Sequence, residues 1–149
     1  IDHFKRINDV HGHDAGDRAL VAVAELARAN AASTDLVARW GGEEFVLLWP
    51  RVDHSAATLR AEQLRQALCA IALRLDDGSS LRLSASFGLA VRQEAEDLGA
   101  LIACADQRLL RAKREGRNRL VCSDVMAVAA IPAAQLEPAQ VTPLTCYRD

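Results

Sequence analysis

The sequence predicts an α/β fold, an α+β sandwich in which helices pack on a mixed, mainly antiparallel sheet. Apolar residues repeat at helical spacing in three long stretches, and shorter apolar runs lie between these stretches. The resulting order is helix, hairpin, helix, strand, helix, strand. With 149 residues, the chain is long enough for one domain with a hydrophobic core and too short for two ordinary domains.

The first part of the chain predicts one helix and one hairpin. Leucine, valine and alanine repeat at helical spacing between residues 14 and 32. Two apolar runs, at residues 35–40 and 45–49, flank Gly41 and Gly42, and this pattern is typical of a hairpin. The second run is apolar at successive positions, so we expect that strand to be covered on both faces.

The middle of the chain predicts a second helix and a strand. Ser55 is the expected N-cap of a helix that runs to about residue 71. The sequence LDDGSSL at residues 75–81 is typical of a turn. Apolar residues then alternate over residues 81–91, as they do in a strand with one buried face.

The last part predicts a third helix and then a change of character. The helix is expected over residues 98–115, with Gly116 at its C′ position, and a short strand follows at 120–122. Three of the four prolines lie after residue 124, where no periodicity is sustained. We therefore expect residues 1–124 to form the domain and residues 125–149 to be a flexible tail or linker.

The overall composition argues against several classes of protein. The balance of 18 basic against 20 acidic residues gives no global sign of a nucleic-acid or membrane partner. No stretch approaches the roughly 18 apolar residues of a membrane helix, and no signal-peptide pattern opens the chain. The four cysteines form no CxxC pair, and Cys69 and Cys104 fall at apolar helical positions. We expect a reduced, cytoplasmic protein.

Two glutamates stand at the turn of the predicted hairpin, in the sequence RWGGEEFVLLWP at residues 39–50. Glutamate is a poor strand former and adjacent like charges repel, so the pair requires an explanation. A glycine backbone can approach a phosphate closely, and a carboxylate suits a hard cation such as Mg²⁺. The alternative is a solvated tip, whose charges keep a strand edge from pairing with another chain.

The sequence IDHFKRINDVHGHDAGD at residues 1–17 is a second candidate site. It contains four aspartates and three histidines, together with an asparagine and a lysine. Asn8 and Asp17 suit the edge of a purine base, because amide and carboxylate groups match its donors and acceptors. Lys5 is suited to holding a phosphate as a point charge.

Two other interpretations of the same segment remain open. In the first, Asp14 is a helix N-cap and the neighbouring polar residues serve a loop and its turns. In the second, His11 and His13 begin a zinc site, but no further Cys or His follows at ligand spacing. The zinc site is the less favoured of the two.

A third candidate is the basic sequence ADQRLLRAKREGRNRL at residues 105–120. Between Arg108 and Arg119 it has six basic residues and one acid. Lys113 and Arg117 are four apart and are expected to share a side near the helix end, where such a pair could grip a triphosphate. The helix macrodipole alone also favours cations there, and a nucleic-acid patch is less favoured because nothing aromatic is interleaved.

Taken in order, these blocks resemble the GGDEF family of diguanylate cyclases. IDHFKRINDVHGHDAGD, RWGGEEF, SASFG and ADQRLLRAKREGRNRL follow one another at matching spacing from residue 1 to about residue 123. The resemblance implies a fold related to the palm of nucleotide cyclases and polymerases. It also implies a homodimer in which each domain holds one GTP, and a reaction that joins the two into cyclic di-GMP with loss of two pyrophosphates.

The resemblance also implies a role for individual residues. A magnesium or manganese ion is expected at Glu43 and at the backbone carbonyl of Ile1, and Glu43 or Glu44 is expected to deprotonate the ribose 3′-hydroxyl. The residues expected to bind GTP are Gly41 and Gly42 around the triphosphate, Asn8 and Asp17 on guanine with His13 beside them, and Phe4, Lys5, Lys113 and Arg117 near the phosphates.

The sequence departs from the family pattern in two places. The family's metal site has a further aspartate immediately before the position of Ile1, at the end of a strand central to the family's sheet. Because neither is part of this sequence, we expect the chain alone to be inactive and its parent protein to be a cyclase. The family's inhibitory Arg-x-x-Asp motif corresponds to ASTD at residues 32–35, where Ala32 replaces the arginine. We therefore expect no strong product inhibition through this site.

A second function remains an alternative at this point. The chain could be a non-catalytic GGDEF module that binds GTP or cyclic di-GMP and regulates a fused or partner domain. The intact sequence GGEEF at residues 41–45 favours catalysis, because members that have abandoned the reaction usually show damage there.

Overall fold

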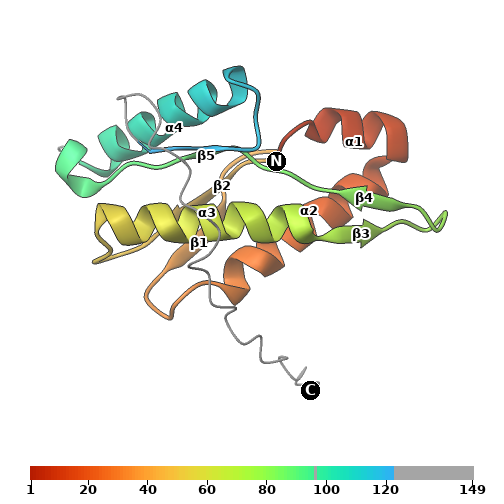
Figure 1. Ribbon diagram of the computed structural model, residues 1–149, viewed down its shortest axis with the longest axis horizontal. Helices are drawn as coiled ribbons and strands as arrows, with labels where there is room; N and C mark the ends of the chain where they lie inside the picture. Colours follow the sequence, from red (N-terminus) through yellow and green to blue (C-terminus); the bar gives the residue numbers. More distant parts are fainter. Residues whose placement is uncertain (96, 123–149) are drawn as a thin grey trace.

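The computed structural model describes residues 1–95 and 97–122 (Figure 1). The tail expected at residues 125–149 lies outside these residues. Helices and short strands are interspersed along the chain in an α+β fold, as predicted. The elements in order are α1 (Phe4–His11), α2 (His13–Ala29), β1 (Leu36–Arg39), β2 (Phe45–Leu48), α3 (His54–Ala70), β3 (Ala72–Arg74), β4 (Ser80–Arg82), β5 (Phe87–Gly88), the 3₁₀ helix η1 (Arg92–Glu94), α4 (Leu98–Arg114) and β6 (Leu120–Val121).

The strands of the described residues pair in three separate two-stranded ladders. The β1–β2 and β3–β4 pairs are antiparallel, and the β5–β6 pair is parallel. The predicted mixture of parallel and antiparallel strand pairs, mainly antiparallel, is therefore present. The pairs form separate ladders and not one central sheet. The start of the chain links two of them, because the backbone nitrogen of Ile1 donates to the Glu43 carbonyl at 2.9 Å and that of Asp2 donates to the Ser84 carbonyl at 2.8 Å.

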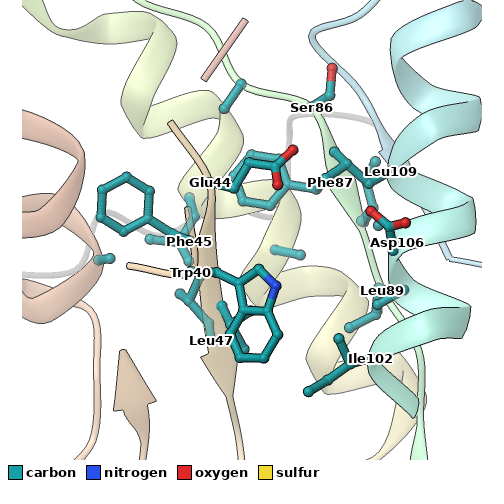
Figure 2. A pocket seen from close by; sticks show the side chains of 18 of the residues that line it. Trp40, Glu44, Phe45, Leu47, Ser86, Phe87, Leu89, Ile102, Asp106 and Leu109 are labelled. Atoms are coloured by element: carbon teal, nitrogen blue, oxygen red, sulfur yellow. The ribbon is translucent and has the colours of Figure 1, made fainter. Parts of the chain in front are cut away.

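A groove separates β2 from β5 and α4 (Figure 2). Its volume is about 450 Å³, and apolar side chains such as Leu47, Leu89 and Ile102 line it. Each bordering strand has one hydrogen-bonded neighbour among the described strands, and all four residues of β2 are partly exposed. The expectation that this strand is covered on both faces is wrong for the described residues. Trp40, which also lines the groove, is 62% exposed.

The hydrophobic core lies where α1, α2 and α3 meet the segment before β5. Its buried cluster consists of Ile7, Ala15, Ala19, Leu68, Leu83 and Ala85. Across the groove, β5 lies directly on α4, because a Cβ at Gly88 would stand 2.0 Å from the carbonyl oxygen of Ala105. Only glycine permits this approach, which holds α4, and with it Lys113, against the parallel pair.

Two helices begin differently from the sequence prediction. The first helix was expected from residue 14, but α1 forms before it because Ile7 is buried in the core and Phe4 packs against it. Gly12, with φ of 84°, then separates α1 from α2, which starts at His13. Asp14 is therefore inside the first turn of α2 and is not its N-cap, although the helix dipole favours a carboxylate there.

Of two predicted helix ends further along the chain, one is wrong and one is confirmed. The N-cap of α3 is Asp53 and not Ser55, because the Asp53 carboxylate accepts the Ala56 N–H at 2.8 Å. Aspartate caps a helix as well as serine does, and Asp53 is the last residue with extended backbone. The third predicted helix is confirmed as α4, and Gly116 follows it in the left-handed region with φ of 112°.

The predicted strand over residues 81–91 is wrong as one continuous element. Only β4 and β5 form there, and β4 pairs with β3, a strand that the sequence analysis did not predict. The turn between β3 and β4 is where it was expected, with Gly78 at φ of 81°. Between β4 and β5 the chain bonds to Asp2, so a long-range partner replaces the strand that local alternation suggested. The short strand expected near residue 120 is confirmed as β6.

Candidate functional site

The turn between β1 and β2 is shaped by its own backbone and by Arg39. The N–H groups of Trp40 and Gly41 both donate to the Glu44 carbonyl, at 2.8 and 3.3 Å. The Arg39 guanidinium donates to the carbonyls of Gly41 and Gly42, with a shortest distance of 2.6 Å to Gly42. These bonds hold the loop closed without using either glutamate side chain.

Both glycines of this turn face open space. A Cβ at Gly42 would meet no protein atom within 4 Å, and one at Gly41 would meet only the Glu44 carboxylate at 3.9 Å. Neither residue is in the left-handed region. The described chain therefore does not itself require glycine here, and the bare backbone is free for a bulky ligand to approach.

The two glutamates are fixed by different contacts. Glu44 Oε1 accepts from Lys113 Nζ at 2.9 Å, so the hairpin turn is joined to the last turn of α4. Glu43 is bonded through its backbone carbonyl to the nitrogen of Ile1. Figure 2 shows Glu44 with Trp40 and Phe87 along the same groove. The structure thus brings together four residues of the predicted site, Ile1, Glu43, Glu44 and Lys113, although Lys113 comes from α4 near the end of the described chain.

The predicted base-binding residues come from α1 and α2, which pack on each other at Gly16. The Asn8 amide lies against Gly16, because a Cβ at Gly16 would stand 1.9 Å from Asn8 Oδ1. Asp17 follows Gly16 and is exposed. Gly16 therefore allows α1 to approach α2 closely. Asn8 is placed beside Gly16, the residue that precedes Asp17.

The other predicted residues of the first segment differ in burial. Lys5 and His13 are exposed, with their side chains accessible to solvent. The Phe4 ring instead packs against the core cluster and faces Gly16. Phe4 therefore has a packing function in the described structure.

Arg117 lies just beyond α4, in a turn of unusual backbone. Its N–H donates to the Ala112 carbonyl at 3.0 Å, which is the bond of a Schellman helix end. Its φ is 60°, and Asn118 follows with φ of 46°, so two non-glycine residues occupy the left-handed region in succession. Arg117 is exposed, and Lys113 is one turn earlier on the same helix end.

The basic stretch at residues 105–120 is not uniformly available to a ligand. Arg108 is 3% exposed and forms two bonds of 2.8 Å to the Glu94 carboxylate. These bonds, chiefly, lower the pKa of Glu94 to about 2. Arg111 and Arg119 both pair with Glu115. The charge density that suggested an anion site is therefore partly structural, and Lys113 and Arg117 remain the better placed candidates.

Asp35, in the stretch ASTD, is engaged within the chain. Its Oδ2 accepts from Arg60 Nη2 at 2.5 Å and from the Ala32 N–H at 2.9 Å. The Arg60 guanidinium, and then the Ala32 amide, hold the pKa of the Asp35 carboxyl below its usual range. Arg60 also lies over the ring of Trp49, 4.6 Å from its centroid. Asp35 thus already has a cationic partner.

Asp2 is a residue of this region that the sequence analysis did not single out. Its buried carboxylate accepts hydrogen bonds from Ser84, Ser86 and the backbone of Asn118. A signal was present, because the two serines alternate with the apolar residues of the sequence LSASF and so share a polar face. Such a pair, facing a buried aspartate, indicates a hydrogen-bonded site.

The described side chains contain no group of three or more His, Cys, Asp or Glu residues placed to hold a metal ion. Cys69, Cys104 and Cys122 are free thiols, and Cys146 lies outside the described residues. Within the part of the chain that is described, every helix is too short or too polar to cross a bilayer.

Comparison with known proteins identifies the class to which this fold and this site belong. The family model described as "Diguanylate cyclase, GGDEF domain" matches residues 1–119. The chain therefore belongs to the GGDEF family. Over 123 residues it is 41% identical to diguanylate cyclase DgcM of Escherichia coli K12, a match that covers 82% of this chain and 29% of DgcM.

Solved GGDEF structures have the same fold. The GGDEF domain of PA1120 (YfiN or TpbB) from Pseudomonas aeruginosa is 38% identical with a TM-score of 0.77, covering 84% of this chain and 78% of that one. The GGDEF domain of DgcB from Caulobacter crescentus, solved in complex with c-di-GMP, is 34% identical with a TM-score of 0.78, covering 82% and 72%. The chain spans less than a third of the length of the curated relatives it matches.

Proposed function

We propose that this chain is the GTP-binding catalytic domain of a diguanylate cyclase. The observation that carries the proposal is the junction at the hairpin turn, where Glu44 pairs with Lys113 and Glu43 is bonded to the backbone of Ile1. Two carboxylates, an open glycine turn and a lysine stand together there, and phosphoryl transfer depends mainly on such positioning and charge. Membership of the GGDEF family and the named cyclases among its relatives support the proposal.

The donors near the turn fit a magnesium or manganese ion. They are oxygens, the Glu43 carboxylate and the Ile1 carbonyl, and both metals accept such hard ligands. Magnesium is commonly held by one or two carboxylates together with substrate phosphates, so this small donor set suits it. When bound, the ion would neutralise phosphate charge and orient the reacting groups.

The cationic side chains hold the triphosphate in this proposal. Lys113 and Arg117 reach it from the end of α4, and Lys5 reaches it from α1. Gly41 and Gly42 leave space for the phosphates, because no side chain projects from that part of the turn. When a phosphate binds Lys113, Glu44 loses its ion-pair partner and becomes available as a base.

The guanine is read by side chains from the two helices that cross at Gly16. Asn8 and Asp17 match the donors and acceptors on the purine edge, and His13 stands at the start of α2 beside them. The Asn8 amide is oriented by its contact with Gly16. Phe4 supports this arrangement by packing α1 on the core.

The chemistry joins two GTP molecules held by two copies of the domain. The ribose 3′-hydroxyl of one GTP attacks the α-phosphorus of the other, so that a new P–O ester bond forms and the bond to pyrophosphate breaks. Glu43 or Glu44 accepts the hydroxyl proton. Two such steps give cyclic di-GMP, and a homodimer with facing sites is therefore needed. The GTP substrate and the free thiols both favour a cytoplasmic location.

We further propose that a strand preceding Ile1 fills the groove between β2 and β5. Both strands present an edge without a hydrogen-bonded neighbour among the described strands, and the groove between them is apolar. Unpaired backbone and exposed apolar surface are both unfavourable, and a strand in the groove would remove both. Ile1 lines the groove, so a preceding segment can enter it directly.

The test is GTP conversion with Mg²⁺, with the product identified by mass spectrometry. Two proteins are compared, the chain as it stands and an extended chain in which the segment before the matched region of DgcM precedes Ile1. Glu44→Gln in the extended chain is the control. Cyclic di-GMP from the extended chain and none from the control is the expected result. GTP binding without product from either protein would favour the regulatory module, and a folded chain that turns over GTP without the extension would overturn the proposal for the groove.

A further inference from the structure

The Asp2 carboxylate joins three segments that are distant in the sequence. Asp2 is 4% exposed. Its Oδ1 accepts from Ser86 Oγ at 2.7 Å, and its Oδ2 accepts from Ser84 Oγ at 3.0 Å and from the Asn118 N–H at 2.9 Å. One side chain thus connects the start of the chain, the segment before β5 and the turn after α4.

This carboxylate is surrounded by neutral donors. The salt bridges between described side chains all involve other acids. Burying a charge costs free energy unless hydrogen bonds surround it, and an apolar side chain of similar volume often serves stability equally well. Stability alone is therefore a weak explanation for an aspartate at this position, and the segments that it connects suggest a better one.

The turn held by Asp2 is the one that carries Arg117. The left-handed conformations of Arg117 and Asn118 are unfavourable for residues that have a Cβ, so surrounding contacts must maintain them. Asp2 fixes the Asn118 N–H, and Arg65 on α3 donates to the Asn118 side-chain oxygen at 2.8 Å. Asn118 is thus held from two sides, and its conformation determines the direction of the preceding residue.

We propose that Asp2 is a positioning residue for nucleotide binding. Through Asn118 it keeps Arg117 in the conformation that presents its guanidinium to the triphosphate. Through its own backbone bond to Ser84 it holds the adjacent Ile1, whose nitrogen donates to the Glu43 carbonyl. This inference rests on the proposed function, because phosphates and a cation are the ligands that these groups serve.

The test is a double-mutant cycle on ligand affinity. Three variants are compared with the wild type, namely Asp2→Asn, Arg117→Ala and the double variant. Each protein is titrated calorimetrically with GTP and, separately, with GMP, and EDTA is present in both titrations. The comparison is made in the chain as it stands and in the extended chain. Asparagine has the shape of aspartate, and the Ser86 hydroxyl can rotate to accept from its amide. GMP retains the guanine and lacks the two outer phosphates. Asp76→Ala is the control, because its side chain is 89% exposed.

We expect Asp2→Asn and Arg117→Ala each to weaken GTP about tenfold, the loss of one charge-assisted contact, with little change for GMP. The double variant should bind GTP no more weakly than Arg117→Ala, because Asp2 acts through Arg117. Additive losses, or equal losses for GTP and GMP, would overturn the inference and leave the proposed function intact. A wild-type protein that binds no GTP would overturn both.

A second variant covers the case in which Asp2→Asn does not fold. Ser86→Ala removes one donor and leaves the Ser84 and Asn118 bonds to Asp2 in place. We expect it to weaken GTP several-fold and GMP hardly at all, since the loss of one hydrogen bond loosens the carboxylate without removing it. If Ser86→Ala binds GTP with the same affinity as the wild type, this result would count against a positioning role for Asp2.

Discussion

Lys113 Nζ lies 2.9 Å from Glu44 Oε1, and this contact joins the end of α4 to the glycine turn between β1 and β2. The two side chains are 28% and 40% exposed. An ion pair of this kind contributes little to stability, because water screens it and two flexible side chains must be ordered. Its importance is positional, since it places a cation at the carboxylates and can separate when a phosphate competes for the lysine.

Lys113→Met is therefore expected to weaken GTP binding by tenfold or more, about the loss of one charge-assisted contact, while the melting temperature hardly changes. Calorimetric titration and thermal denaturation measure the two quantities. Arg114→Met, at the exposed neighbouring position, is the matched control and should bind GTP as the wild type does. Equal GTP affinities for wild type and Lys113→Met would contradict this assignment.

Glu44→Gln is expected to abolish turnover in the extended chain while GTP binding persists. The substitution removes a negative charge near the triphosphate and keeps the shape of the side chain, so affinity should stay the same or rise. The measurement is single-turnover product formation beside equilibrium binding. Substantial product formation by this variant would move the base function to Glu43.

Gly42→Ala and Gly88→Ala are expected to have opposite effects. At Gly42 the added methyl meets no protein atom within 4 Å, so the protein should melt as the wild type does but bind GTP more weakly. At Gly88 the methyl would stand 2.0 Å from the Ala105 carbonyl, so stability should fall by about 3 kcal/mol. Urea denaturation measures the stability of both variants, and calorimetric titration measures their GTP affinity. An unchanged GTP affinity in Gly42→Ala would show that the open turn is not a phosphate site.

Gly16→Ala is expected to reproduce the effect of Asn8→Ala on nucleotide choice. The new methyl would stand 1.9 Å from Asn8 Oδ1, so the amide must leave its position. Alanine also favours a helix by about 1 kcal/mol over glycine, so the helix itself should not be lost. The measurement is the ratio of GTP to ATP affinity. A ratio that falls in Asn8→Ala and not in Gly16→Ala would refute the orientation of Asn8 by Gly16.

Glu94 is expected to contribute to acid stability. Its pKa is lowered to about 2, first by the bonds from Arg108, so its contribution is complete above its ordinary value of 4.5 and is lost as the pH falls toward 2. Glu94→Gln should lower stability at pH 7 by about 3 kcal/mol, because the two bonds from the buried Arg108 guanidinium to this carboxylate lose their charge-assisted character. The difference in free energy of unfolding between wild type and variant, measured by denaturant titration, should become smaller below pH 4.5. Glu115→Gln, in an exposed pair, is the control and should change stability far less.

Product inhibition through Asp35 is expected to be weak. Ala32 cannot supply an arginine, and the Asp35 carboxylate is already held by Arg60 and the Ala32 amide. Asp35→Ala in the extended chain should therefore leave the inhibition constant for cyclic di-GMP unchanged, although it should lower the melting temperature because the Arg60–Asp35 ion pair is lost. Inhibition that is present in the wild type and lost in the variant would show that this stretch binds product.

The local patterns of the sequence were sufficient for much of the fold. The helical repeat before residue 32, the apolar runs around Gly41 and Gly42, and the stop at Gly116 each depend on neighbouring residues, and the structure has the corresponding elements. The order of the sequence blocks also indicated the family, which the comparison confirms. The local patterns missed α1 and β3 and misplaced the caps of α2 and α3, because packing decides where these elements form and begin.

The contacts that assemble the site could not be predicted in this way. Lys113 and Glu44 are separated by 69 positions, and Asp2 and Asn118 by 116. Alternation over residues 81–91 indicated one strand, but the bonds of Ser84 and Ser86 to Asp2 interrupt it. The sequence by itself determined which residues carry charge and where each helix and turn can form. The tertiary structure alone decided which charges meet, because a buried carboxylate or a lysine at a helix end takes its partner from whatever element the packing brings within hydrogen-bond distance.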